Sequence, residues 1–204
     1  MREILSAAAE VGLKMAASLR FGDYLPETLY YQDRQWHNVL NVLDVEFKED
    51  SFLNIDARVG MFIIGYSISP AMVMNMVGKG SKYPFAYRDA EGGYLSGSKV
   101  YRLHIPANVP AANFWSVTLY DASNASGLDN DQPFPSIGSL DDLQYNADGS
   151  LDLYFASELP ADAPESNWLR TVPDKGWFTL FRLYSPTEPF FDQSWKPGDF
   201  EKIG

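Results

Sequence analysis

The segment NFWSVTLYD, residues 113–121, decides the fold class because its side chains alternate with period two. One set is apolar: Trp115, Val117 and Leu119. The other set is polar or aromatic: Phe114, Ser116, Thr118 and Tyr120. Successive side chains of a β-strand point to opposite faces of its sheet, so the pattern predicts a strand with one face in the core. The second face is either ordinary sheet surface or the wall of a binding site.

Period-two patterns continue around this segment from about Tyr83 to the C-terminus, separated by turns rich in Gly, Asp and Pro. We expect strands, in chain order, within YPFAYRD, YLSGSKVYRLHIP, NFWSVTLYD, LQYN, LDLYFAS and GWFTLFRLYSP. Residues 122–138 are expected to form an irregular surface loop. Short antiparallel strands at this spacing predict a β-sandwich, jelly-roll-like in form.

The first part of the chain has helical spacing of its apolar residues instead. We expect helices over residues 2–19, about 28–43, about 54–68 and 70–78. The sequence therefore predicts an α+β protein, with a helical segment over residues 1–78 packed on a β-sandwich domain over residues 79–204.

An uncharged run over residues 59–77 approaches the length of a membrane span. Pro70 and several Gly and Ser residues interrupt it, so we expect two short buried helices and no membrane span. The N-terminus has the pattern of an amphipathic helix, because charged residues interrupt its apolar positions, and it does not resemble a signal peptide.

Composition restricts the function. The 204 residues carry a formal net charge of −11 without a basic cluster, which argues against nucleic acid as a partner. The absence of cysteine excludes disulfides and thiolate chemistry. No nucleophile elbow, phosphate loop or dinucleotide fingerprint occurs, and we expect no cofactor.

Several separated motifs resemble, in order, the domain-of-unknown-function family 1214. They are GSKYPFAYRDAEGGYLSGSKVYRLHIPANVPAANFWSVTLYD, NADGSLDLYF, ESNWLRT and GWFTLFRLYSPTEPFFDQSWKPG, and they cover about residues 78–204. The resemblance implies a jelly-roll-like sandwich and no established reaction. In that family this part usually follows a domain of family 1254, of which this sequence has no counterpart. The chain is then expected to be a truncated form, a fragment or a short member, and a periplasmic or envelope location is implied by the resemblance alone.

Candidate site residues come from the polar faces of three expected strands. If these strands are neighbours, one surface holds Arg102, His104, Ser116, Thr118, Tyr120, Asp152 and Tyr154. It is either the solvated face of a sheet or a site where a sugar or another flat polar ligand stacks on an aromatic ring.

Asn167 and Trp168, in ESNWLRT, form a second candidate. They either anchor a loop, with Trp168 at the edge of the core, or form the rim of a ligand site together with Arg170. Arg182 is expected to form a structural ion pair with Asp121.

Metal binding has little support. The two histidines, His37 and His104, have no second ligand at metal spacing. The loop LDNDQ, residues 128–132, and the turn at Asp148 offer oxygen atoms to a calcium ion, but neither has the closing Glu of a calcium loop. We therefore expect no metal.

Three functions remain open. The chain is a module that binds a small molecule or carbohydrate or contributes to assembly of an envelope protein, or it is an enzyme acting on a polar small molecule or glycan. In the enzyme His104, Asp152 or Asp121 acts as acid or base, and Arg102 or Arg182 binds an anionic group. The third function is that of a purely structural oligomerisation domain, whose aromatic surface includes the segment PFFDQSW, residues 189–195, and packs on a neighbouring subunit; we expect a homo-oligomer.

Overall fold

The computed structural model describes residues 1–22, 29–38, 46–48, 50–64 and 74–204. The chain forms two compact units, one made of Met1–Thr28 and Val39–Met74 and the other of Leu29–Asn38 and Asn75–Gly204. The first unit contains the helices α1 (Arg2–Phe21) and α2 (Ile55–Ile64), which contact each other. Both helices were predicted from the spacing of apolar residues. In the described part of the chain, no helix is both long and apolar enough to cross a membrane.

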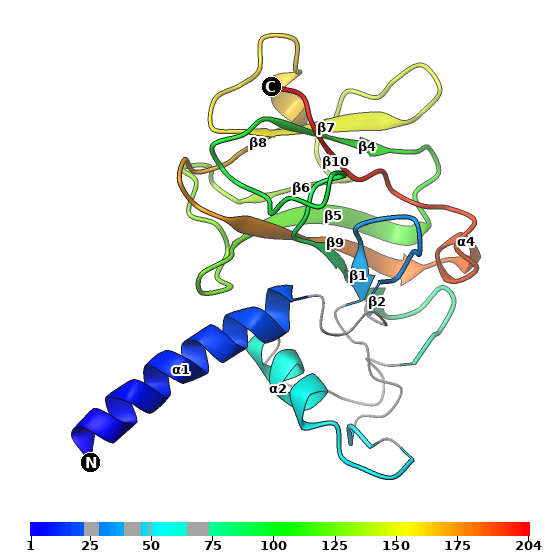
Figure 1. Ribbon diagram of the computed structural model, residues 1–204. Helices are drawn as coiled ribbons and strands as arrows, with labels where there is room; N and C mark the ends of the chain where they lie inside the picture. The colour runs from blue at the N-terminus through cyan, green and yellow to red at the C-terminus, as the bar shows by residue number, and fades with distance from the viewer. Residues whose placement is uncertain (23–28, 39–45, 49, 65–73) are drawn as a thin grey trace. The chain divides into compact units, whose positions relative to one another are not determined.

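The second unit is built from two sheets (Figure 1). The six-stranded sheet has the order β1 (His37–Asn38), β3 (Pro84–Ala86), β9 (Trp177–Pro186), β5 (Ala111–Asp121) and β6 (Ser136–Gly138), and β2 (Ser81–Lys82) also pairs with β9. The four-stranded sheet has the order β10 (Phe200–Lys202), β4 (Tyr101–Ile105), β7 (Leu151–Ala156) and β8 (Trp168–Arg170). Pairing is antiparallel except between β7 and β8, which are parallel. A 3-10 turn, η2 (Glu165–Asn167), precedes β8, and a short helix, α4 (Glu188–Phe191), follows β9.

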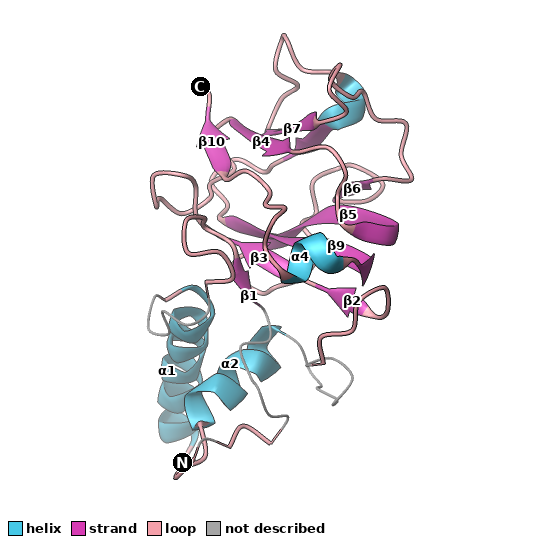
Figure 2. Ribbon diagram, turned by 90° about the vertical axis from the view of Figure 1, so that its right-hand side faces the viewer, coloured by secondary structure: helices cyan, strands magenta, loops and turns pink. Residues whose placement is uncertain are grey.

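The two sheets face each other across one hydrophobic core (Figure 2). Trp115, Val117 and Leu119 of β5 are at most 5% exposed, as the alternation in NFWSVTLYD predicts. Leu103 and Leu153 contribute from the other sheet. The predicted α+β class with a sandwich-like β part is confirmed.

The helix predicted over residues 28–43 is wrong for the described residues Leu29–Asn38, whereas residues 39–43 lie outside the description. His37 pairs with Phe85 of β3 and also forms a bridge to Leu29. Trp36 is fully buried against Phe181 and Phe200, and its indole N–H donates to the Gly198 carbonyl at 2.8 Å. Burial of this large side chain outweighs the local helical spacing.

The last predicted helix, 70–78, lies partly outside the described residues, and Met74–Gly78 are not helical. LQYN is not a strand, because the N–H and C=O of Gln144 pair with the side-chain amide of Asn167. Conversely, β6 lies inside the expected loop 122–138. Gly138 is required there, since a Cβ atom would lie 2.2 Å from the Trp115 carbonyl oxygen.

The aromatic side chains of PFFDQSW belong to the fold of this chain. Phe190 is buried and stacks on Tyr30 with ring centroids 4.7 Å apart. Trp195 is buried against Phe181 and donates its indole N–H to the Ala107 carbonyl at 3.1 Å. The expectation that this segment presents an aromatic surface to another subunit is therefore wrong for these two rings.

Candidate functional site

The structure divides the predicted surface between two sheets. Arg102, His104, Asp152 and Tyr154 lie on the outer face of the four-stranded sheet, because their neighbours Leu103 and Leu153 point into the core. Three predicted residues lie instead on the outer face of the six-stranded sheet: Ser116, Thr118 and Tyr120. The core separates these faces, so the predicted single surface is wrong. Alternation assigns a residue to a face, but β4 and β5, although consecutive, belong to different sheets.

Four side chains form a line across all strands of the four-stranded sheet, which we call the cross-strand row. Glu201 pairs with Arg102, Arg102 with Tyr154, and Tyr154 with Trp168. Neighbouring strands lie about 4.8 Å apart, so the row spans about 14 Å. It combines a cation, a carboxylate and two aromatic rings on one face.

Arg102 and Glu201 form an ion pair at 2.6 Å at one end of the row. The hydrogen bond to Glu201 raises the pKa of Arg102, and the two opposite charges balance each other. Both side chains keep substantial exposure, 41% for Arg102 and 51% for Glu201, so the pair remains accessible to a ligand.

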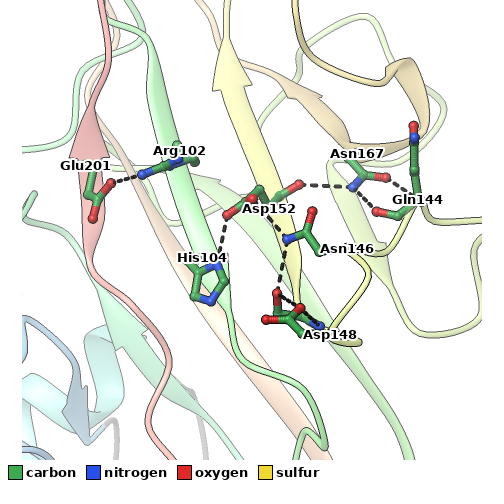
Figure 3. A network of polar contacts seen from close by, with 9 residues as sticks. Arg102, His104, Gln144, Asn146, Asp148, Asp152, Asn167 and Glu201 are labelled. Carbon is green, nitrogen blue, oxygen red and sulfur yellow. Dashed lines mark hydrogen bonds and ion pairs between the residues drawn. The ribbon is translucent and has the colours of Figure 1, made fainter.

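His104 and Asp152 face each other beside the row (Figure 3). His104 Nδ1 lies 2.9 Å from Asp152 Oδ1, and the His104 side chain is 44% exposed. With the neutral imidazole donating from Nδ1 to the carboxylate, Nε2 is left as a proton acceptor. A histidine oriented in this way can accept or deliver a proton.

A network of amides and hydroxyls holds Asp152 in place. Asn146 Nδ2 donates to Asp152 Oδ2 at 3.2 Å, and Asn167 Nδ2 donates to the Asp152 carbonyl at 3.0 Å. Asp148 accepts hydrogen bonds from the hydroxyl and N–H of Ser150. The Ser150 hydroxyl is the largest cause of the lowered pKa of Asp148, and the nearby His104 adds to it.

Asn167 makes the contacts of a loop anchor. It is 2% exposed, its Oδ1 accepts from the Gln144 N–H at 2.9 Å, and its Nδ2 donates to the Gln144 carbonyl at 2.8 Å. Trp168 lies on the outer face, and its indole N–H donates to the Ala156 carbonyl at 3.0 Å. Of this predicted pair, only Trp168 belongs to the cross-strand row.

The predicted ion pair between Arg182 and Asp121 does not form. Asp121 Oδ2 lies 3.1 Å from Lys175 Nζ, and Arg182 donates instead to the hydroxyl of Tyr120. The register explains the difference, because Arg182 lies opposite Ser116 whereas Asp121 lies opposite Trp177. Burial raises the pKa of Tyr120 although the charge of Arg182 acts to lower it.

The loop LDNDQ covers the free edge of β8. Gln132 Oε1 accepts from the Arg170 N–H at 2.8 Å, and Asn130 Nδ2 donates to the Arg170 carbonyl at 2.7 Å. These amides replace the partner strand that β8 lacks. Across the described ranges, no group of three or more His, Asp or Glu side chains could hold a metal ion.

Two members of the site, Asn146 and Glu201, were missed by the sequence reasoning. Glu201 follows the buried Phe200, so alternation in the short strand β10 could have placed it on the outer face. Asn146 lies in the segment expected to be a strand, and its contact with Asp152 depends on the turn that follows.

The sandwich and its polar outer faces define an α+β protein with two facing sheets. The chain belongs to the family described as "Protein of unknown function (DUF1214)", which matches residues 80–188. The resemblance inferred from the motifs is confirmed.

Solved structures that resemble the chain include the following two. The VPA0106 protein from Vibrio parahaemolyticus has 22% sequence identity and a TM-score of 0.56, over 74% of this chain and 36% of its own. A putative uncharacterized protein from Burkholderia cenocepacia has 19% identity and a TM-score of 0.45, over 60% of this chain and 29% of its own. The chain thus spans about a third of the length of these two proteins. No curated protein matches it.

Proposed function

We propose that the outer face of the four-stranded sheet binds a polar small molecule, with a sugar as the class that fits it best. The observation that carries this proposal is the cross-strand row, in which Tyr154 and Trp168 lie beside the paired charges of Arg102 and Glu201. The chain acts in this proposal as a binding module of an envelope-associated protein, the location that the family resemblance implies.

Sugars fit this combination of side chains. The C–H face of a sugar ring packs on an aromatic ring, and its hydroxyls both donate and accept hydrogen bonds. Glu201 and Asp152 supply acceptors, and Arg102 supplies donors. Because Arg102 is already neutralised by Glu201, the face favours a neutral ligand over a strongly charged one.

A thermal-shift screen of mono- and oligosaccharides on the whole chain tests the proposal, because a ligand that binds the folded state raises the melting temperature. Tyr154→Ala should weaken binding of the best sugar roughly 2- to 10-fold through loss of ring packing. Tyr145→Ala is the matched control, since Tyr145 is exposed and lies off the row. The proposal fails if no sugar shifts the wild type, or if both variants bind equally well.

A second function, general acid/base chemistry on the bound molecule, is favoured by the pair of His104 and Asp152 at 2.9 Å. Asp152 orients the imidazole, so that Nε2 serves as the base. The test incubates the sugars that bind with the protein and detects products by chromatography. His104→Gln and Asp152→Asn should each lower turnover by about 100-fold or more. Turnover that is equal in His104→Gln and the wild type would exclude this role.

A further inference from the structure

Arg182 on the opposite sheet is a cation without a carboxylate partner. It is partly buried on the outer face of β9, and no Asp or Glu of the described chain forms an ion pair with it. Its guanidinium donates a hydrogen bond to the hydroxyl of Tyr120, and its Nε is buried without an acceptor. A guanidinium has five N–H donors, and within the described residues one of them bonds to Tyr120.

The surroundings of Arg182 are hydroxyls and aromatic rings. Ser116 lies directly opposite it on β5. Two residues further along β5, the hydroxyl of Thr118 lies 2.9 Å from the hydroxyl of Ser136. Phe114 and Tyr184 form a stacked pair, with ring centroids at 3.9 Å. The charged and titratable groups that affect the pKa of Tyr120 are Arg182, Tyr184 and Tyr83, and none of these is a carboxylate.

A partly buried guanidinium without a counter-charge is costly, because burial removes water from the ion and one hydrogen bond to a neutral phenol compensates this loss only in part. This is unusual in a chain with a net charge of −11, where carboxylates are plentiful. Burial also keeps Tyr120 neutral, since its pKa is raised, so the phenol does not supply the missing charge.

We propose that Arg182 and Tyr120, with Ser116 opposite, form a binding site for an anionic oxygen group, a carboxylate or a phosphate. The guanidinium fork matches the paired oxygens of either group, and the Ser116 hydroxyl is placed to add a donor. The site lies on the outer face of the six-stranded sheet and is distinct from the cross-strand row.

Titration calorimetry of the whole chain with phosphate, and separately with acetate, tests this site against sodium chloride at the same ionic strength. Arg182→Gln should weaken binding of the anion about tenfold or more, because a charged hydrogen bond is lost. Arg34→Gln is the matched control, since it removes an arginine that already has Asp33 as its partner at 3.0 Å, and it should bind as the wild type does.

A second measurement needs no variant. The Nε–H resonance of Arg182 should shift on addition of phosphate or acetate and remain fixed with chloride. Tighter binding of phosphate would assign the site to phosphoryl groups, and tighter binding of acetate would assign it to carboxylates. The inference is overturned if neither anion shifts this resonance, or if Arg182→Gln folds and binds with wild-type affinity.

Discussion

Asp121, at the end of β5, illustrates how contacts set the charge of one side chain. Burial acts against its ionisation, but the Ser123 hydroxyl and N–H and the Lys175 ammonium outweigh this effect and lower the pKa. The pKa in the folded state is thus below the unfolded value of about 3.9. Ionised Asp121 therefore stabilises the fold above about pH 4, and this stabilisation is lost as the pH falls through the folded pKa.

Asp121→Asn should lower the free energy of unfolding at pH 7 by about 1–3 kcal/mol, because it removes a charged acceptor. It should also flatten the acid side of the stability profile, which urea denaturation between pH 2 and pH 7 measures. Asp162→Asn, at an exposed position, is the control and should leave the profile unchanged. Parallel profiles for all three proteins would contradict the assigned role of Asp121.

At the scale of residues, the sequence predicted on which face of a sheet a side chain lies better than it predicted which side chain it contacts. The alternation in β5 correctly placed Trp115 and Val117 in the core. It did not indicate that Arg182 reaches Tyr120 and not Asp121, because a partner depends on the register between strands distant in the sequence. The functional roles of the candidate residues stay predictions.

At the scale of elements, local patterns predicted a helix or strand correctly where the spacing of its apolar residues matches the face that is buried. They predicted α1, β5 and β7, in which one face is consistently apolar. They failed for Leu29–Asn38, whose apolar residues have helical spacing while Trp36 is buried in the core of the sandwich. The local patterns also missed β6 and β8. Each of these strands has only three residues, and it is its pairing with a neighbouring strand that makes it a strand.

The edge of β8 carries a prediction of its own. Gln132→Ala leaves the Arg170 N–H without its acceptor, so the free energy of unfolding should fall by about 1–3 kcal/mol. Hydrogen exchange of the Arg170 amide should become faster in the variant. Gln144→Ala serves as control, because the side chain of Gln144 is exposed. An unchanged exchange rate at Arg170 would show that the Gln132 amide does not protect this edge.

At the scale of the whole molecule, the second unit joins distant parts of the chain. Tyr30, from the early segment, stacks on Phe190 and donates its hydroxyl to the Phe190 carbonyl at 2.9 Å. The family motifs predicted the sandwich. They did not predict that Leu29–Asn38 would form part of it, because the resemblance begins at about residue 78.

Phe190→Ala should therefore lower the free energy of unfolding by about 3–5 kcal/mol, the usual cost of removing a buried aromatic ring. Phe134→Ala, at a site 76% exposed, should cost less than about 0.5 kcal/mol. Urea denaturation measures both changes, and equal costs for the two variants would contradict the role of Phe190 in the core. Homo-oligomer formation stays a prediction, which light scattering of the wild type decides.

The amides that cover β8 also make this edge sensitive to slow hydrolysis of a side chain. Asparagine and glutamine are chemically labile, and hydrolysis of the Asn130 amide would put a carboxylate against the Arg170 carbonyl in place of an N–H donor. Two acceptors would then repel each other, the loop would leave the sheet, and the strand edge would be open to pairing with another molecule. Hydrolysis at one side chain would thus open this edge of the sheet to association between molecules.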